Sequence, residues 1–328
     1  MGRSTTPLKE ARRSVRATIE PTLIYLHIGK TAGVTLHQVL RRQFSPSQTL
    51  WLHRSPIERG QAAKATAGAE RDEEEAVPSE DRPIRERSLA YVASLPREEL
   101  ARVRLIEGHT IYGLHRCLPR PAVYATLLRE PVARVISGYG YIRRRPGHPL
   151  HALSHRLSLD EFLRSGNALQ LDNGQTRAIA GDTRTAFGEC THELAESAKR
   201  NIEEHFAVVG LTEWFDESLL LMRRAFGWRN VHYVPANVSR RSRSSREVDT
   251  RTRRVIEELN QLDVELYEWT RERVGLTIEA ESDLDEELRR FRAVNILYRP
   301  WGHLTYTLPR AVLMALRSGG ARRTTPDS

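Results

Sequence analysis

Residues 23–35 read LIYLHIGKTAGVT, a stretch that combines two signals for an α/β fold. Leu23–Ile28 is a mostly apolar run, and a helical pattern over Thr31–Gln43 follows it directly. Such runs are typical of strands covered on both faces, and their alternation with helices predicts an α/β fold with a central, mainly parallel sheet flanked by helices. Four similar runs bounded by turn residues lie at Val103–Ile106, Val123–Leu128, Ala207–Leu211 and Val231–Val234.

Further helical patterns and the charged stretches between them predict the extent of the domain. We expect other helices at Pro131–Arg143, Leu157–Arg164, Thr191–Phe206 and Asp216–Phe226, and one long helix at about 244–273. We expect residues 1–19 to form a disordered arm and residues 54–88 to form a charged mobile insertion, because both stretches have few large apolar side chains. The main domain is therefore expected at 20–275, and an extension with a disordered tail at 276–328.

The charge balance favours an anionic ligand. The 328 residues include 51 Lys and Arg against 42 Asp and Glu, a formal net charge of +9. A field of this sign attracts anions. Four of the basic residues are lysines, so Lys30 stands out in a chain that otherwise uses arginine.

The apolar runs and the cysteines predict where the protein works. No run approaches the roughly 18 residues of a transmembrane segment. The basic amino terminus lacks the apolar stretch of a secretory signal, and two cysteines are too few for a disulfide framework. We therefore expect a cytoplasmic protein, with peripheral contact with a membrane surface left open.

Two loops at the carboxyl ends of predicted strands have the composition of anion sites, since ligands of open α/β sheets bind at that edge. In the first loop, residues 27–35, small residues, a lysine and hydroxyl groups begin a helix. Ile24 stands where a Walker A loop needs its first glycine, so this is not a Walker A loop. The second loop carries Arg129 just before a helix and Ser137 about two turns into it. The alternatives are an ordinary strand–helix turn and a surface arginine paired with Glu130.

These loops and four other segments resemble the sulfotransferase family 2 domain, which includes heparan sulfate 2-O-sulfotransferases and bacterial carbohydrate-type sulfotransferases. The segments are HIGKTAGVT at 27–35, EGHTIYGLH at 107–115, LREPVARVISGYG at 128–140, LDNGQTRAIAG at 171–181, VGLTEWFDESLLLMRR at 209–224 and NVSRR at 237–241. Six short patterns in the family's order are a stronger signal than any one of them. The resemblance covers about residues 21–275.

The resemblance implies a P-loop-like three-layer fold and the donor 3′-phosphoadenosine 5′-phosphosulfate. It assigns binding of the 3′-phosphate to Arg129 and Ser137. The chain departs from the family pattern at Ala32, where glycine is usual, and we expect Ala32 to take a right-handed backbone conformation. Binding of the 5′-phosphosulfate is assigned to Lys30, Thr31, Ala32, Gly33 and Thr35.

Sulfuryl transfer removes a proton from the acceptor hydroxyl, so a base is expected near the donor. His109 follows the second predicted strand, and a neutral imidazole suits this role near neutral pH. The family's Gly-His pair points to the same residue, although a histidine with only a packing role is the plainer alternative. Glu107 is the rival base and is expected to face the opposite side of its strand. Lys30 would stabilise charge on the leaving oxygen. The scheme needs no metal, and the sequence contains no HExxH or similar metal motif.

The resemblance also implies a carbohydrate or glycoconjugate acceptor, with Asn173 and Arg177 as acceptor-orienting residues. Two other function classes are open from the residues alone. A P-loop-type small-molecule kinase would need a carboxylate for Mg²⁺, and we find no convincing one. A nucleic-acid-binding protein would gather its arginines into one groove, whereas here they scatter among acids. We therefore expect no nucleic-acid partner. The acceptor's identity, the hydroxyl modified and the oligomeric state do not follow from such patterns.

Overall fold

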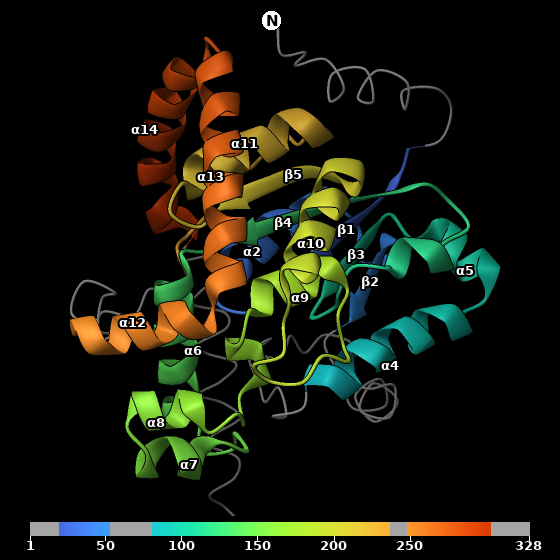
Figure 1. Cartoon of the computed structure of the whole chain (residues 1–328). Coiled ribbons are helices and arrows are strands. Elements are labelled where there is room, and N and C mark those ends of the chain that lie inside the picture. The colour runs from blue at the N-terminus through green and yellow to red at the C-terminus, as the bar shows by residue number, and fades with distance from the viewer. Residues whose placement is uncertain (1–19, 53–80, 237–247, 303–328) are drawn as a thin grey trace, which may run out of the picture.

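The structure, a computed structural model, describes residues 20–52, 81–236 and 248–302 (Figure 1). At its centre is one sheet of five parallel strands in the order β2-β3-β1-β4-β5. The strands are β1 (Thr22–Leu26), β2 (Thr49–Leu52), β3 (Leu105–Gly108), β4 (Ala122–Leu128) and β5 (Phe206–Leu211). The predicted arm, most of the predicted insertion and the end of the extension lie outside the described residues. The last part of that insertion, from Asp81, is helical.

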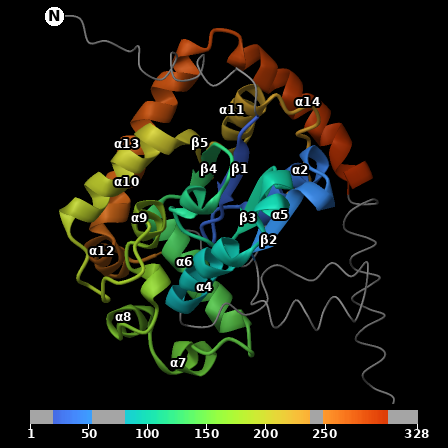
Figure 2. The ribbon, with the colours of Figure 1, turned by 90° about the vertical axis from the view of Figure 1, so that its right-hand side faces the viewer.

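Helices pack on both faces of the sheet and make it the middle of three layers (Figure 2). One face packs against α4 (Asp81–Ser94), α5 (Arg97–Arg102), α9 (Gly174–Ala180), α10 (His192–His205) and α13 (Gln261–Ala280). The other packs against α2 (Gly33–Gln43), α11 (Phe215–Phe226) and α14 (Leu284–Gly302). A third apolar cluster joins α6 (Pro131–Arg144), α7 (His151–Arg156), α8 (Leu159–Arg164) and α12 (Thr250–Leu259). Short 3₁₀ helices are η1 (Pro46–Gln48), η2 (Leu114–Cys117) and η3 (Leu169–Leu171). No described helix combines the length and the apolar character that a membrane crossing requires.

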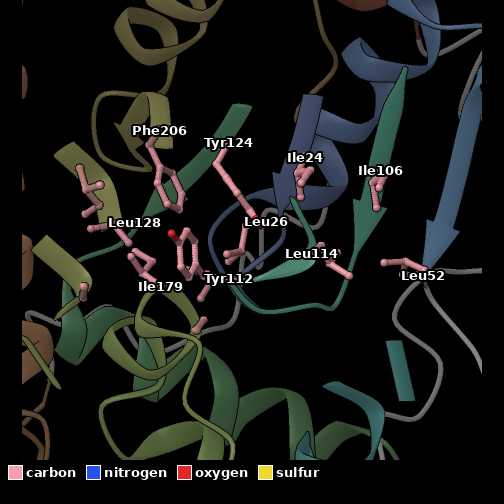
Figure 3. Close-up of a cluster of buried hydrophobic side chains, with 14 of the residues drawn as sticks. Ile24, Leu26, Leu52, Ile106, Tyr112, Leu114, Tyr124, Leu128, Ile179 and Phe206 are labelled. Carbon is pink, nitrogen blue, oxygen red and sulfur yellow. The ribbon is translucent and has the colours of Figure 1, made fainter. Parts of the chain in front are cut away.

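Side-chain alternation along β1 explains why the sheet has a core on each face. Ile24 and Leu26 point into one cluster together with Tyr124 of β4 (Figure 3). Leu23 and Tyr25 point into the other. Because successive side chains of a strand alternate between faces, an apolar run without alternation produces a strand buried on both sides. The predicted α/β fold with a central parallel sheet flanked by helices is confirmed.

The prediction of a strand at Val231–Val234 is wrong. Backbone N–H groups of this segment bond to side chains instead: Tyr233 N–H donates to Asn295 Oδ1 over 2.8 Å, and Val234 N–H to Gln38 Oε1 over 3.4 Å. These partners belong to α14 and α2, so the segment runs between two helices. The fifth strand is β2, a four-residue edge strand of alternating burial that no sequence pattern predicted.

The long helix predicted at 244–273 is wrong in its middle, because α12 and α13 are separated at Asn260. Asn260 Oδ1 accepts a hydrogen bond from Asn173 N–H over 3.0 Å. Asn173 Oδ1 in turn accepts the N–H groups of Leu262 and Asp263 in the first turn of α13. Amide side chains thus satisfy backbone groups at a helix end, so the chain turns here although the apolar periodicity continues.

Candidate active site

A cavity of about 680 Å³ lies where β1 and β4 end. Both predicted anion loops contribute to it, the first after β1 and the second after β4. A single cavity therefore contains the two cations that the sequence placed at separate strand ends. Six of the residues predicted to bind the donor line this cavity: Lys30, Ala32, Gly33, Thr35, Arg129 and Ser137.

The loop after β1 turns sharply because two non-glycine residues have left-handed backbones. Lys30 has a φ of 71°, and Ala32 has a φ of 62° with a ψ of 19°. The expectation of a right-handed Ala32 is therefore wrong, and this position carries strain of roughly 1–2 kcal/mol that glycine would avoid. Ala32 is the N-cap of α2. The turn thus brings the first turn of α2 to the cavity wall, where the helix dipole favours anions.

Gly33 leaves no room for a side chain because the ring of His27 covers it. A Cβ on Gly33 would lie 1.9 Å from His27 Nε2. His27 lines the cavity, and its ring stacks on His109 with centroids 4.7 Å apart and planes at 21°. His27 therefore separates the predicted base from the anion loop. No sequence pattern predicted a role for His27, although it is the first residue of the segment HIGKTAGVT.

The two threonines of this loop differ in what their hydroxyls can bind. Thr31 is fully buried, and its Oγ1 donates to Ile28 O over 2.8 Å. Thr35 lines the cavity, and its Oγ1 accepts a hydrogen bond from Ala236 N–H over 3.1 Å, so its proton can still be donated to an anion. The side chain of Thr35 therefore fits the predicted contact with the phosphosulfate, and that of Thr31 does not.

Arg129 joins the second loop to the first. Its Nη1 donates to the backbone carbonyl oxygen of Lys30 over 3.1 Å. The Glu130 carboxylate is engaged in capping α6, where it accepts two N–H groups of the first turn. Burial lowers the pKa of Arg129, an effect that Glu213 and Glu130 oppose, and the guanidinium stays charged at neutral pH.

Another part of the cavity wall is the side of α6 that carries Tyr141. The Tyr141 ring centroid lies 4.5 Å from Lys30 Nζ and 5.2 Å from the guanidinium carbon of Arg145, so cation–π attraction holds both cations at the wall. None of the described lining residues is acidic. A cavity of this charge attracts a polyanion. Its described cations are Lys30, Arg129, Arg144 and Arg145.

Two aromatic residues supply a less polar part of the wall. Phe215 and Tyr233 meet edge to face with centroids 4.8 Å apart. The Tyr233 hydroxyl donates to Asp216 over 2.7 Å, and burial together with this carboxylate raises the pKa of Tyr233. Such ring faces can pack against a nucleotide base. Sequence patterns did not reveal this pair, because the rings come from separate segments.

Glu107 and His109 are the two candidate bases. Glu107 is fully buried, and its Oε1 lies 2.8 Å from Nδ1 of His37 on α2. Glu107 lies beside Tyr25 in the sheet, and the rings of Tyr25, His27 and His109 stack in turn on that face. The expectation that Glu107 faces away from His109 is therefore wrong. Enclosure against α2 keeps Glu107 from an acceptor. His109 is half-buried and stacks on His27 of the cavity wall, but it is not among the described lining residues, so its role as the base stays a prediction.

Asn173 and Arg177 hold α9 in place, and neither is among the described residues of the cavity wall. Arg177 is 1% exposed, and it pairs with Asp172 and Asp182 at 2.6 Å each. Its remaining N–H groups donate to three backbone carbonyl oxygens, so all five donors are used. Asn173 caps α13. This geometry speaks against the predicted acceptor-orienting role of both residues.

Comparison with known proteins assigns the family. A family model described as galactose-3-O-sulfotransferase matches residues 100–296, well over half of the chain. The chain belongs to the galactose-3-O-sulfotransferase family. The part of the chain that matches the family model includes His109 and Arg129, whereas the loop that carries Lys30 lies before the matched residues. The match also runs past the predicted domain end at residue 275 and into α14.

Curated relatives of this family member carry related names. Galactose-3-O-sulfotransferase 3 of Homo sapiens is 31% identical over 166 residues, which cover 47% of this chain and 38% of the relative. Heparan-sulfate 6-O-sulfotransferase 1 of Homo sapiens is 32% identical over 182 residues, which cover 47% of this chain and 44% of the relative. Heparan-sulfate 6-O-sulfotransferase 2 of Danio rerio is 33% identical over 180 residues, which cover 45% of this chain and 37% of the relative. The chain thus spans less than half the length of these relatives. The resemblance to carbohydrate sulfotransferases is confirmed, and the finer likeness to 2-O-sulfotransferases or bacterial members stays a prediction.

Proposed function

We propose that this chain is a sulfotransferase that moves a sulfuryl group from 3′-phosphoadenosine 5′-phosphosulfate to a hydroxyl of a carbohydrate or glycoconjugate. The observation that carries the proposal is the single cavity that Lys30 and Arg129 share, beside the first turn of α2 and the later turns of α6. The donor carries anionic groups on both the 3′ and 5′ sides of its ribose. The first turn of α2 with Lys30, and Arg129 with the Ser137 hydroxyl of α6, suit such a molecule.

The residues around the cavity fit each part of the donor. Lys30 and Thr35, with the backbone at Gly33, would hold the 5′-phosphosulfate. Arg129 and Ser137 would hold the 3′-phosphate, because a guanidinium and a hydroxyl are both strong donors to phosphate oxygens. The aromatic pair on α11 and the segment after it would face the adenine.

The chemistry then follows from positioning and charge. A bond forms between the acceptor oxygen and sulfur, while the bond between sulfur and the bridging phosphate oxygen breaks, with the two oxygens in line. The His109 imidazole takes the proton of the acceptor hydroxyl and later releases it to water. Lys30 balances the charge on the leaving oxygen. The products are the sulfated carbohydrate and adenosine 3′,5′-bisphosphate.

The two other function classes fit the cavity less well. A kinase holds Mg²⁺ at the phosphates with a carboxylate, and no described lining residue is acidic. A nucleic-acid groove needs cations spread along a backbone, whereas Lys30 and Arg129 converge on one cavity. The carbohydrate acceptor is supported by the names of the family and its relatives. Independence from metal and a cytoplasmic location stay predictions.

Removal of the Lys30 ammonium tests the proposal. The parent protein should bind adenosine 3′,5′-bisphosphate in calorimetry and transfer radiolabelled sulfate from the donor to lactose or to heparan sulfate. Lys30→Ala should lose roughly tenfold or more in affinity, since it removes a charged hydrogen-bond donor. Arg289→Ala removes the same charge from an exposed position on α14 and should bind like the parent. Parental affinity in Lys30→Ala, or displacement of the nucleotide by ATP or RNA, would contradict the proposal.

A further inference from the structure

The side chain of Gln175 pairs with both backbone polar groups of Arg129. Its Oε1 accepts a hydrogen bond from Arg129 N–H, and its Nε2 donates one to Arg129 O, each over 2.9 Å. Gln175 is fully buried in the first turn of α9. Its amide therefore does for Arg129 what a neighbouring strand does for a residue inside a sheet.

This pairing occurs where the sheet stops guiding the chain. The register of β4 with β5 ends at Leu128, whose carbonyl oxygen accepts both the N–H and the hydroxyl of Thr212. Arg129 is the next residue, and its guanidinium reaches across to Lys30 O. The direction in which Arg129 leaves the strand is thus set by the amide of Gln175.

A buried carboxylate fixes Gln175 in turn. Asp263 of α13 is fully buried and accepts the N–H of Gln175 over 3.2 Å and the N–H and hydroxyl of Thr176 over 2.8 Å each. Asp263 Oδ2 also lies 3.2 Å from Nη2 of Arg134 on α6. The first turn of α9 is therefore anchored to both α13 and α6. Such a network holds the Gln175 amide in one place.

We propose that Gln175 is a positioning residue for Arg129 and thereby sets the preference of the cavity for nucleotides that carry a 3′-phosphate. The inference rests on the proposed function, in which Arg129 binds that phosphate. Gln175 is not among the described lining residues, so it acts through Arg129. A guanidinium binds phosphate well only when its planar fork faces the oxygens. Release of the Arg129 backbone therefore weakens this contact and spares the contacts to the rest of the nucleotide.

The experiment compares adenosine 3′,5′-bisphosphate with adenosine 5′-monophosphate as ligands of the full chain in calorimetry. The ratio of the two affinities measures the contribution of the 3′-phosphate. Gln175→Leu keeps a similar volume but pairs with neither backbone group of Arg129. In Gln175→Leu, both backbone groups of Arg129 lose their buried partners, so the backbone no longer fixes the direction of the guanidinium. The ratio should therefore fall about tenfold, because the contact with the 3′-phosphate is weakened. The affinity for the monophosphate should stay within about twofold of the parent.

Further variants separate positioning from a general loss of structure. In an Arg129→Ala background, Gln175→Leu should lower the ratio no further, because no guanidinium is left to orient. Thr176→Val removes a hydroxyl bond to Asp263 but keeps the Gln175 amide, so it should lower stability and leave the ratio unchanged. Gln175→Glu keeps the acceptor for Arg129 N–H and should retain part of the preference, which provides a second test if the leucine variant does not fold.

The outcomes distinguish the inference from the function on which it rests. A parental ratio in Gln175→Leu, or an equal fall in both affinities, would overturn the role of Gln175 and leave the proposed function standing. A parent protein that binds the two nucleotides equally would overturn both.

Discussion

The Arg129 guanidinium donates a hydrogen bond from Nη1 to the backbone carbonyl oxygen of Lys30 over 3.1 Å, although 99 positions separate the two residues in the sequence. The bond ties the loop after β4 to the loop after β1, and these strands are neighbours in the sheet. The two predicted anion sites are thus held at a fixed separation before a ligand binds. Such preorganisation reduces the entropy lost on binding.

His109→Ala should slow turnover without weakening donor binding. The imidazole stacks on His27 and is not itself among the described lining residues, so its loss removes the proposed base and spares the predicted anion loops. We expect turnover to fall by roughly 10²-fold or more, measured with radiolabelled donor, and nucleotide affinity to stay within about twofold. His192→Ala, at an exposed position on α10, is the control. Equal turnover in parent and variant would remove His109 from the mechanism.

Gly33→Ala should damage the site. The added Cβ would lie 1.9 Å from His27 Nε2, so the imidazole must move, and that ring also supports His109. Turnover should fall roughly tenfold or more, because even a small displacement of a catalytic group lowers the reaction rate strongly. The matched control is Gly29→Ala in the same loop, where a Cβ has nothing within 4 Å.

A second substitution tests the cause of that damage. Adding His27→Ala to Gly33→Ala makes room for the methyl group and should restore part of the unfolding free energy that Gly33→Ala loses. Parental turnover in Gly33→Ala alone would show that His27 does not pack on Gly33.

Ala32→Gly should stabilise the protein by about 1 kcal/mol, because glycine takes a φ of 62° without steric strain. The midpoint of urea unfolding measures the change. Ala293→Gly, at an exposed position in the middle of α14, should instead lose about 1 kcal/mol. Both substitutions free the unfolded chain equally, so the pair isolates the backbone conformation. A loss at both positions would contradict the left-handed conformation of Ala32.

His115 should make the protein less stable in mild acid. Burial lowers the pKa of His115 below its ordinary 6.5, and His205 and Arg116 act in the same direction. Tyr124 Oη accepts the N–H groups of Gly113 and His115 and lies 3.0 Å from His115 Nδ1. The hydroxyl proton of Tyr124 is therefore donated to a neutral Nδ1, which protonation of the ring would prevent.

The direction of the pH effect follows from this pKa. The unfolded chain binds a proton at His115 more readily than the folded chain, so the stabilisation is complete above about pH 6.5 and is lost as the pH falls below it. Between about pH 7.5 and about pH 5.5, the melting temperature of the parent should fall more than that of His115→Asn, which does not titrate. His155→Asn, exposed on α7, should keep the parental dependence. An equal fall in all three proteins would contradict this role of His115.

Sequence patterns predicted most of the sheet and the two anion loops. Apolar runs mark β1, β3, β4 and β5 because burial on both faces demands them, and Lys30 and Arg129 are conspicuous because each follows such a run. Their convergence could be expected because carboxyl ends of parallel strands meet at one edge of a sheet. The edge strand β2 carried no such signal, since its four residues are only partly buried.

Local patterns are informative about this chain wherever backbone propensity and side-chain alternation act over a few residues, as in its strands and helices. Long-range contacts settled the rest. Arg177 is enclosed by two aspartates instead of facing an acceptor, and Gln175 serves Arg129, which is 46 positions away, while Asp263, 88 positions away, anchors Gln175. No periodicity encodes such pairs, because they form only when α9 and α13 pack against the end of β4.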